Sequence, residues 1–241
     1  MQVSTEGPTL VGRIEAIWRY PIKSMAAEPL STTHVSWQGL AGDRRWAFVR
    51  EGLERSSFPW LTLRQRPDLN LFRPTLVDLE DPENSLARVV TPAGETLDVT
   101  DPRLAHQLWP EGARVIRQSR GVFDTFPLSV ITRQSIQQLA ELVGEDLDVQ
   151  RFRPNLLVDS EGGSFPEDGW VGSVLQVGGV RMRIDKRDGR CAVITIDPET
   201  GARSPEILRA VAAERDGCMG VYGTTVEPGA ISVGDEVWIE P

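Results

Sequence analysis

Histidine and cysteine are scarce in this sequence, and their scarcity excludes several classes of site. Among 241 residues there are two histidines, His34 and His106, and two cysteines, Cys191 and Cys218. The cysteines have no Cys-x-x-Cys spacing, so neither a structural zinc site nor a disulfide framework is expected. So few histidines also argue against His-rich metal sites and most Ser-His-Asp arrangements. Sulfur or a cofactor must therefore supply most ligands for any metal chemistry.

Long apolar runs and an excess of positive charge are also missing. No run of 18 apolar residues occurs, which argues against a membrane-spanning helix. Residues 1–10 contain Glu6 and Pro8 and no apolar segment, so no secretory signal is expected. The 26 Lys+Arg face 35 Asp+Glu, a net charge of −9, which disfavours nucleic-acid and membrane partners but allows a local basic pocket. We expect a cytoplasmic protein that binds neither nucleic acid nor membrane.

Short apolar runs separated by 22 glycines and 17 prolines are typical of many short strands joined by turns. Pro92-Ala93-Gly94 and Gly178-Gly179 each predict a hairpin, and Gly234-Asp235 predicts a turn or bulge. In the first predicted strand, Ile14, Ala16, Trp18 and Tyr20 alternate onto one face. The predicted strands cover residues 12–20, 45–50, 60–63, 88–91, 95–99, 173–177, 180–184, 191–196 and 231–239.

Helices are fewer. The spacing predicts a helix over residues 132–142 with Thr132 as N-cap, and another over 204–213 with Ser204 as cap and Pro205 at its first position. A short third helix is expected over residues 101–109. The pattern alone suggests a boundary within residues 117–126, before the first clear helix.

Cys191 follows a run that is unusually basic for an acidic chain. Residues 181–190 contain five cations and only two carboxylates. Nearby cations stabilise a thiolate, the form of cysteine that attacks electrophiles and binds metals. The alternative is a buried cysteine next to a solvated charged turn. Cys218 lacks such neighbours, and we interpret it as structural.

Three further segments combine cations with hydrogen-bonding groups. Lys23 and Ser24 follow a strand end and are suited to hold a phosphate or carboxylate. Arg44 is suited to bind an anion. The alternative is an exposed ion pair with Asp43, which would contribute little to stability. Arg153 and Asn155 precede an apolar strand, where they suit either a polar ligand or structural hydrogen bonds. Each segment is ambiguous by itself.

Taken in order, the motifs resemble a known family. The series YPIKS, GLAGDRRW, LTLRQRP, RFRPNLLV, RCAVITIDPETG and ISVGDEVWI resembles the MOSC family, in particular members with its N-terminal β-barrel domain, such as the mitochondrial amidoxime-reducing component and its bacterial relatives. The resemblance extends from about residue 12 to residue 240. The most specific element begins at Arg190-Cys191 and continues to Asp197, Pro198, Thr200 and Gly201.

The resemblance implies a β-dominated α+β fold. An N-terminal β-barrel-like domain (residues 12–99) would pack on a MOSC β-barrel with a few peripheral helices (residues 100–241). It also implies the molybdenum cofactor in its nucleotide-free form, bound in a cleft between the two domains, with Cys191 as a ligand of the metal. The residues that match the family's cofactor contacts are Lys23, Ser24, Arg44, Thr125, Arg153, Asn155, Arg190 and Cys191.

Two positions depart from the family pattern. Relatives often carry hydroxyl residues at both positions before Pro127, but here only Thr125 has a hydroxyl and Phe126 replaces the other. Gly189 stands where some relatives have a small hydroxyl residue. Asp124 is a candidate proton donor near molybdenum, with a turn aspartate as the alternative.

The implied activity is reduction of N-hydroxylated compounds by oxygen-atom transfer, with Cys191 and Asp124 as catalytic residues. Some bacterial relatives carry a [2Fe–2S] domain that needs four cysteines. With two cysteines here, we expect electrons from a separate protein of ferredoxin, flavin reductase or cytochrome type. The alternative is a cofactor carrier or persulfide sulfur carrier without reductase activity, because MOSC domains also occur at the end of molybdenum cofactor sulfurases.

Overall fold

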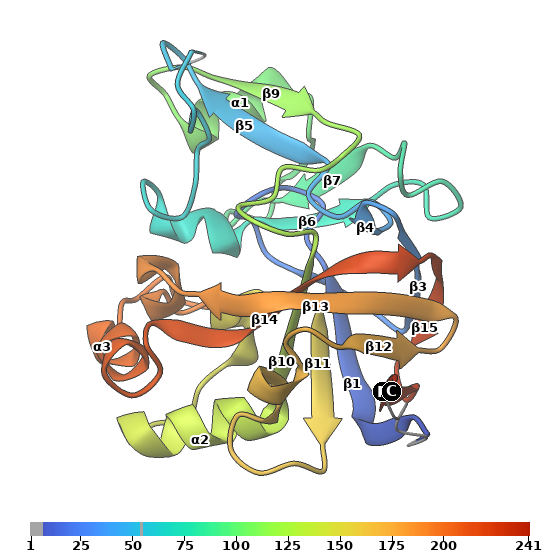
Figure 1. The fold of residues 1–241 in the computed structure, drawn as a ribbon. Coiled ribbons are helices and arrows are strands. Elements are labelled where there is room, and N and C mark those ends of the chain that lie inside the picture. Colours follow the sequence, from blue (N-terminus) through green and yellow to red (C-terminus); the bar gives the residue numbers. More distant parts are fainter. Residues whose placement is uncertain (1–6, 54) are drawn as a thin grey trace.

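The computed structural model describes residues 7–53 and 55–241 (Figure 1). The described part is a β-dominated α+β fold that contains a seven-stranded barrel and three α-helices. No helix in these residues has the length and apolarity needed to span a membrane. The expectation of no secretory signal falls partly on residues 1–6, which lie outside the described residues.

The barrel forms the lower half of the molecule in Figure 1. Its strands follow the order β11-β10-β14-β13-β12-β16-β1, and antiparallel pairing of β1 with β11 closes it; β2 extends the sheet beside β1. These strands are β1 (Thr9–Arg19), β2 (Glu28–Leu30), β10 (Leu128–Thr132), β11 (Leu156–Ser160), β12 (Val174–Val177), β13 (Val180–Gly189), β14 (Cys218–Glu227) and β16 (Glu236–Ile239).

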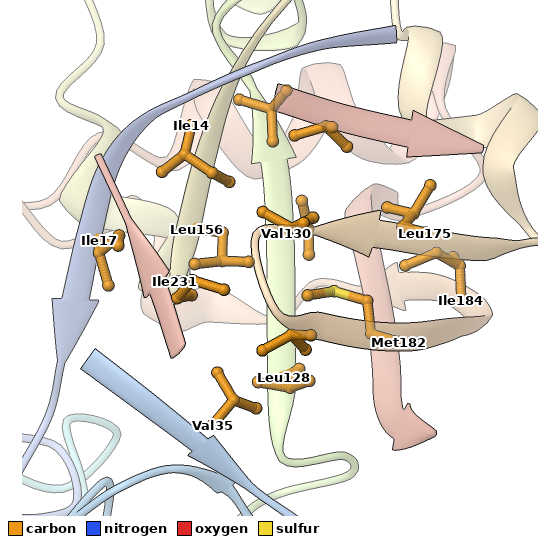
Figure 2. Packing of buried hydrophobic residues seen from close by; sticks show 14 of the residues in the cluster. Ile14, Ile17, Val35, Leu128, Val130, Leu156, Leu175, Met182, Ile184 and Ile231 are labelled. Carbon is orange, nitrogen blue, oxygen red and sulfur yellow. The ribbon is translucent and has the colours of Figure 1, made fainter. Parts of the chain in front are cut away.

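Aliphatic side chains from all seven strands fill the barrel (Figure 2). The predicted alternation along the first strand is only partly right. A register shift between Ile14 and Ala16 turns the strand, so that Ile14 and Ile17 face the barrel core. Ala16 and Trp18 pack instead against a second cluster beneath the helices. A bulge of this kind moves every later side chain to the opposite face.

The N-terminal module lies above the barrel in Figure 1. Its two sheets and α1 enclose a separate core that includes Trp46, Phe48, Leu69 and Phe72. These elements are β5 (Trp46–Arg50), the 3₁₀ helix η1 (Pro67–Leu71), β6 (Arg73–Leu76), β7 (Ala87–Val90), β8 (Thr96–Asp98), α1 (Pro102–Leu108) and β9 (Ala113–Arg117). A further sheet joins β3 (Thr32–Ser36) to β4 (Gly39–Leu40) and β15 (Gly229–Ser232).

Strands on each side of the predicted division at residue 99 pair within the other part of the molecule. β1 belongs to the barrel, although the rest of the barrel begins only at residue 128. Conversely, β9 pairs with β5 in the N-terminal module. The division at residue 99 stays a prediction.

The three predicted helices are confirmed. α1 begins after Asp101, whose side chain accepts a hydrogen bond from the Arg103 backbone, and α2 (Arg133–Val143) is capped by Thr132. α3 (Pro205–Glu214) follows Ser204, which makes no side-chain cap. The remaining 3₁₀ helices are η2 (Val149–Phe152), η3 (Pro166–Trp170) and η4 (Ala192–Thr195).

Both predicted hairpins are confirmed, as β7–β8 and β12–β13, and Gly234-Asp235 forms the turn between β15 and β16. Two strand predictions are wrong. Residues 192–195 form η4, and of residues 60–63 only Trp60 makes an isolated bridge. In both segments apolar side chains enter the core from backbone that is not a strand, a 3₁₀ helix in one and an irregular segment in the other, so apolarity alone does not identify a strand.

Candidate functional site

A cavity of about 320 Å³ lies between the N-terminal module and the barrel. Six cationic side chains and two carboxylates line it, together with the Cys191 thiol and several aromatic rings. The cations are Lys23, Arg44, Arg64, Arg151, Arg153 and Arg190. The carboxylates are Asp124 and Asp188. The cavity is therefore strongly electropositive in a protein whose net charge is −9.

Strained backbone marks the loops that form this cavity. Among the described residues, five non-glycine residues have positive φ, and Ser24, Arg44 and Arg153 are three of them, at 69°, 51° and 52°. Residues with a Cβ rarely adopt this conformation, and such strain tends to gather at binding sites. The three residues lie on different loops, and each lines the cavity.

Asp43 and Asn155 hold these loops together behind the cavity. The Asp43 carboxylate, fully buried, accepts hydrogen bonds from the Tyr20 backbone (2.7 Å) and the Asn155 amide (3.2 Å), and it pairs with Arg44. The Asn155 amide also donates to the Trp18 carbonyl at 3.1 Å. Both Asn155 functional groups are engaged by the protein, so here its side chain positions the loop.

Two guanidinium groups stack on one tyrosine. The Cζ atoms of Arg44 and Arg153 lie 4.5 Å and 4.3 Å from the centre of the Tyr20 ring. Burial, together with the charge of Arg44, lowers the pKa of Arg153 to about 10. Burial raises the pKa of Tyr20, which keeps its hydroxyl neutral. The ring thus offers a neutral π face to two like charges, and its attraction for each guanidinium partly offsets their mutual repulsion.

Lys23 and Asp124 form an ion pair on the other side of the cavity. Their Nζ and Oδ1 atoms are 2.6 Å apart, and Nζ also donates to the Val122 carbonyl at 3.1 Å. Burial lowers the pKa of Lys23, against the opposite effect of Asp124. Burial would raise the pKa of Asp124, but attraction to Lys23 outweighs it, and the net pKa is lowered. Asp124 is therefore a carboxylate at neutral pH.

Arg190 is fixed by backbone carbonyls and by a buried carboxylate. It donates to the carbonyls of Met219 (2.7 Å) and Phe152 (2.8 Å) and lies 2.8 Å from Asp188 Oδ2. Burial raises the pKa of Asp188, against the opposing effect of Arg190. Gly220, with φ of 73°, makes room for this arrangement, because a Cβ there would lie 2.8 Å from the Val130 carbonyl and 3.2 Å from Arg190 Nη2.

Cys191 is half-buried at the N-cap of η4. Four of the five cations predicted to surround it point elsewhere. Arg181, Arg183 and Arg187 pair with carboxylates on or near the barrel, and Lys186 lies 5.6 Å from the Phe126 ring. Of the five cations in the run, only Arg190, which follows the end of β13, lines the cavity.

Arg64 supplies the second cation beside the thiol, and it comes from the N-terminal module. The proximity of its guanidinium to the Cys191 side chain raises the pKa of Arg64. The motif LTLRQRP contained this residue, but its spacing assigned it no role. Arg64, Ser129, Asp188 and Tyr222 all line the cavity and were not predicted as site residues.

All nine predicted site residues line the cavity. They are Lys23, Ser24, Arg44, Asp124, Thr125, Arg153, Asn155, Arg190 and Cys191. Phe126, which interrupts the family pattern, packs with Tyr222 at a ring-centre distance of 6.1 Å and forms part of the wall. The individual roles of these residues stay predictions.

The donor groups of the cavity fit an anionic cofactor. Arg153 Nη2, Arg190 Nη2 and Ser129 Oγ are buried and have no hydrogen-bond partner within the described residues. Unpaired buried donors are costly, and a phosphate or a polar heterocycle would satisfy them. The described residues contain no cluster of three or more His, Cys, Asp or Glu suited to a metal ion. Cys191 alone suits a soft ligand role, so a metal here needs its other ligands from a cofactor.

Comparison with protein-family models identifies the family to which this chain belongs. Residues 117–238, just over half of the chain, match the MOSC domain, and residues 11–121 match the MOSC N-terminal beta barrel domain. The chain belongs to the MOSC domain family. The family match covers both modules that form the cavity.

Similar proteins are distant. A molybdenum cofactor sulfurase from Drosophila erecta is 29% identical over 87% of this chain and 31% of its own length, and that from Drosophila melanogaster is 29% identical over 86% and 31%. The chain thus spans about a third of these relatives. Among solved structures, the YUAD protein from Bacillus subtilis matches with a TM-score of 0.50 at 12% identity, over 95% of this chain and 96% of that one, which supports the fold.

Proposed function

We propose that this MOSC-domain protein binds the nucleotide-free molybdenum cofactor between its two modules and reduces N-hydroxylated compounds. The observation that supports this proposal is the cavity itself. Buried, unpaired cationic donors line the cavity that holds the half-exposed thiol, and the described residues contain no group of three or more His, Cys, Asp or Glu that could hold a metal ion. This arrangement suits a ligand that carries both a phosphate and its own metal-binding sulfurs.

Several cationic residues would each contact a different part of such a ligand. Arg153 and Arg190 each offer a free Nη2 to phosphate or pterin oxygens, and both guanidinium groups are already fixed by stacking or by carbonyls. Lys23 and Ser24 approach from the N-terminal module. Fixed donors lose little side-chain entropy on binding, so the cavity is preorganised for an anion.

Cys191 provides the protein's ligand to the metal. Arg64 and Arg190 line the same cavity as the thiol. A bound molybdenum cofactor would supply two-electron redox chemistry for reduction of the substrate N–O bond. Cleavage of the N–O bond then consumes two electrons and two protons and releases water, with the electrons delivered by a separate donor protein.

Solvent, rather than Asp124, is the immediate proton source in the proposed reaction. Its lowered pKa and its ion pair with Lys23 keep it a carboxylate at neutral pH, so it does not carry a proton to donate. Its side chain is 64% exposed at the mouth of the cavity. In the proposed reaction, Asp124 accepts a hydrogen bond from the N–OH group or from the water that delivers the proton.

The first test measures molybdenum and pterin in protein purified from a host that makes the cofactor. We expect nearly one molybdenum and one pterin per wild-type chain. Cys191→Ser should retain pterin but lose turnover of an amidoxime with a reduced electron donor. Arg153→Gln should lower pterin content several-fold, because one fixed phosphate donor is removed. Cys218→Ser is the matched control and should behave as wild type.

Two results would contradict the proposal, and each would contradict a different part of it. If neither pterin nor molybdenum is present, even after incubation with free cofactor, the cofactor assignment is wrong. If both are present but no N-hydroxylated compound is turned over, the reductase assignment is wrong and the cofactor assignment stands.

A second candidate is a cofactor or sulfur carrier, and the names of the similar proteins favour it. The sulfurases match this chain over about a third of their length. In this role Cys191 carries a persulfide, which a cationic setting also favours. Intact-mass analysis discriminates the two after incubation with a small-molecule persulfide, whose outer sulfur passes to the Cys191 thiolate while the donor's own thiolate leaves. A gain of one sulfur atom, absent in Cys191→Ser and without reductase turnover, supports the carrier.

A further inference from the structure

The six cations that line the cavity differ in exposure and in what holds them. Four of them pair with carboxylates of the chain, namely Lys23, Arg44, Arg151 and Arg190. Arg153 is buried and stacks on the Tyr20 ring. Arg64 is exposed, and in the part of the chain that the structure describes it forms no ion pair with a carboxylate. Of these six, Arg64 alone combines an exposed guanidinium with an unpaired charge.

The backbone around Arg64 is held in place, although its side chain is exposed. The leucines at positions 61 and 63 are buried in the core of the N-terminal module. Between them, the buried Thr62 hydroxyl accepts a hydrogen bond from the Arg64 backbone at 3.3 Å and donates one to the Gln65 side chain at 2.8 Å. The guanidinium therefore extends from a fixed point in the cavity wall.

Two neighbours locate the Arg64 guanidinium. Its Cζ atom lies 5.8 Å from the centre of the Phe58 ring, which is 36% exposed and also lines the cavity. The Cys191 side chain is near enough to raise the pKa of Arg64, and the charge of Asp124 acts in the same direction. An unpaired, exposed cation is therefore close to the thiol that we assign to the metal.

Neither Asp124 nor the cofactor accounts for this charge. Asp124 is already paired with Lys23 at 2.6 Å, so it does not neutralise Arg64. The unpaired donors that fit the cofactor, on Arg153, Arg190 and Ser129, are buried, whereas Arg64 is exposed. A substrate approaches the metal site from solvent, so it meets the exposed groups of the wall.

We propose that Arg64 makes the site selective for aromatic N-hydroxylated compounds that also carry a carboxylate. The inference rests on the proposed function, because it names the class of substrate that the same site takes. One guanidinium fits the two oxygens of a carboxylate through a pair of parallel N–H groups. The partly exposed Phe58 ring offers apolar surface to an aromatic ring that joins the two substrate groups.

Calorimetric titration of the full chain, purified from a host that makes the cofactor, tests the inference. The ligands are neutral benzamidoxime and its meta- and para-carboxy derivatives, which are anions at neutral pH and place the carboxylate at two distances from the N–OH group. No reductant is added, so binding is measured without turnover. We expect at least one carboxylate to bind about five-fold more tightly than benzamidoxime, and high salt should reduce the difference because Arg64 is exposed.

Variants assign the preference to Arg64. Arg64→Gln removes the charge and should abolish the preference for the carboxylate ligands. Arg64→Lys keeps the charge without the planar pair of donors and should retain part of it. Arg88→Gln, at an exposed position of β7 outside the cavity, removes the same charge and is the matched control, which should keep the full preference.

Equal binding of the neutral and carboxylate ligands would overturn the inference, as would no binding of any of them. A preference that survives in Arg64→Gln, or that is also lost in Arg88→Gln, would overturn it as well, because the attraction would then not come from Arg64.

Turnover of benzamidoxime with a reduced donor tests the proposed function separately. Turnover without a carboxylate preference would support the reductase and contradict the role of Arg64. The predicted binding preference without turnover of any of the three compounds would support the carboxylate site and contradict the reductase assignment.

Discussion

Asp188 and Arg190 form a buried ion pair in the wall of the cavity. The Asp188 carboxylate is 2% exposed, lies 2.8 Å from Arg190 Nη1 and lines the electropositive cavity. Burial nevertheless raises the pKa of Asp188, so desolvation outweighs the attraction of the cation. A buried pair of this kind gives little net stability. The pair is therefore better suited to position Arg190 for a ligand than to stabilise the fold.

Asp188→Asn should change how stability depends on pH. With a raised pKa, the folded protein binds the proton of Asp188 more tightly than the unfolded chain does. This contribution to stability is complete below the unfolded pKa of about 3.9 and is lost as pH rises through the folded pKa. Asparagine removes that loss, so the stability of the variant relative to wild type should increase with pH above about 4.

Urea denaturation at several pH values measures this difference. Asp146→Asn, at an exposed position, controls for the loss of one negative charge. A stability difference between wild type and Asp188→Asn that stays constant, or shrinks, with rising pH would contradict the predicted direction of the pKa change.

Residue types could be predicted at this scale, but their partners could not. Motif spacing identified Cys191, Lys23 and Arg153, and all three line the cavity. It could not show that the cation beside the thiol is Arg64, because the contact joins residues more than 120 positions apart. Which charged side chains lie close together is decided only when the chain folds.

Helices are the elements that the sequence specified most clearly. α2 begins after Thr132, whose hydroxyl accepts a hydrogen bond from the Ser135 backbone at 3.2 Å. The same hydroxyl lies 2.6 Å from Glu167 Oε2, and Ser135 Oγ also donates to this atom at 2.6 Å. Glu167 is fully buried. The cap therefore also donates to Oε2 of a buried carboxylate.

Thr132→Ala should destabilise the protein by about 1–3 kcal/mol, because it removes the cap and leaves the Glu167 carboxylate short of a donor. Thr132→Ser keeps the hydroxyl and should recover most of that loss. Equilibrium unfolding in urea measures both. Equal loss in the two variants would show that packing of the threonine methyl, and not the hydroxyl network, matters at this position.

Strands were predicted less well than helices for a physical reason. Period-two alternation assumes an unbroken ladder, and the register shift in β1 breaks it between Ile14 and Ala16. Residues 192–195 are apolar enough for a strand, but they form η4, which places Ile194 in the core beside the helices. Both departures depend on what packs against the segment, which local pattern does not contain.

At the scale of the whole molecule, the barrel depends on the first strand of the chain. β1 pairs with β16 on one side and β11 on the other, and its Ile14 and Ile17 enter the barrel core. Without β1, two strand edges would be exposed and the core would lose two large side chains.

A fragment of residues 100–241 should therefore not fold cooperatively by itself. Near-ultraviolet circular dichroism and thermal unfolding should show no sharp transition in the fragment, whereas the full chain unfolds cooperatively. A fragment with dispersed amide signals and a cooperative transition would instead support an independent domain beginning at residue 100.

The sequence by itself determined the residue types of the site, the three helices, the hairpin turns and the family, because each is recorded in local spacing or in motifs read in order. Only the tertiary structure decided how β1 closes the barrel, which cation meets the Cys191 thiol, and that Asn70 and Arg151 meet on Asp197. Those features join residues distant along the chain, and burial and packing between the two modules bring them together.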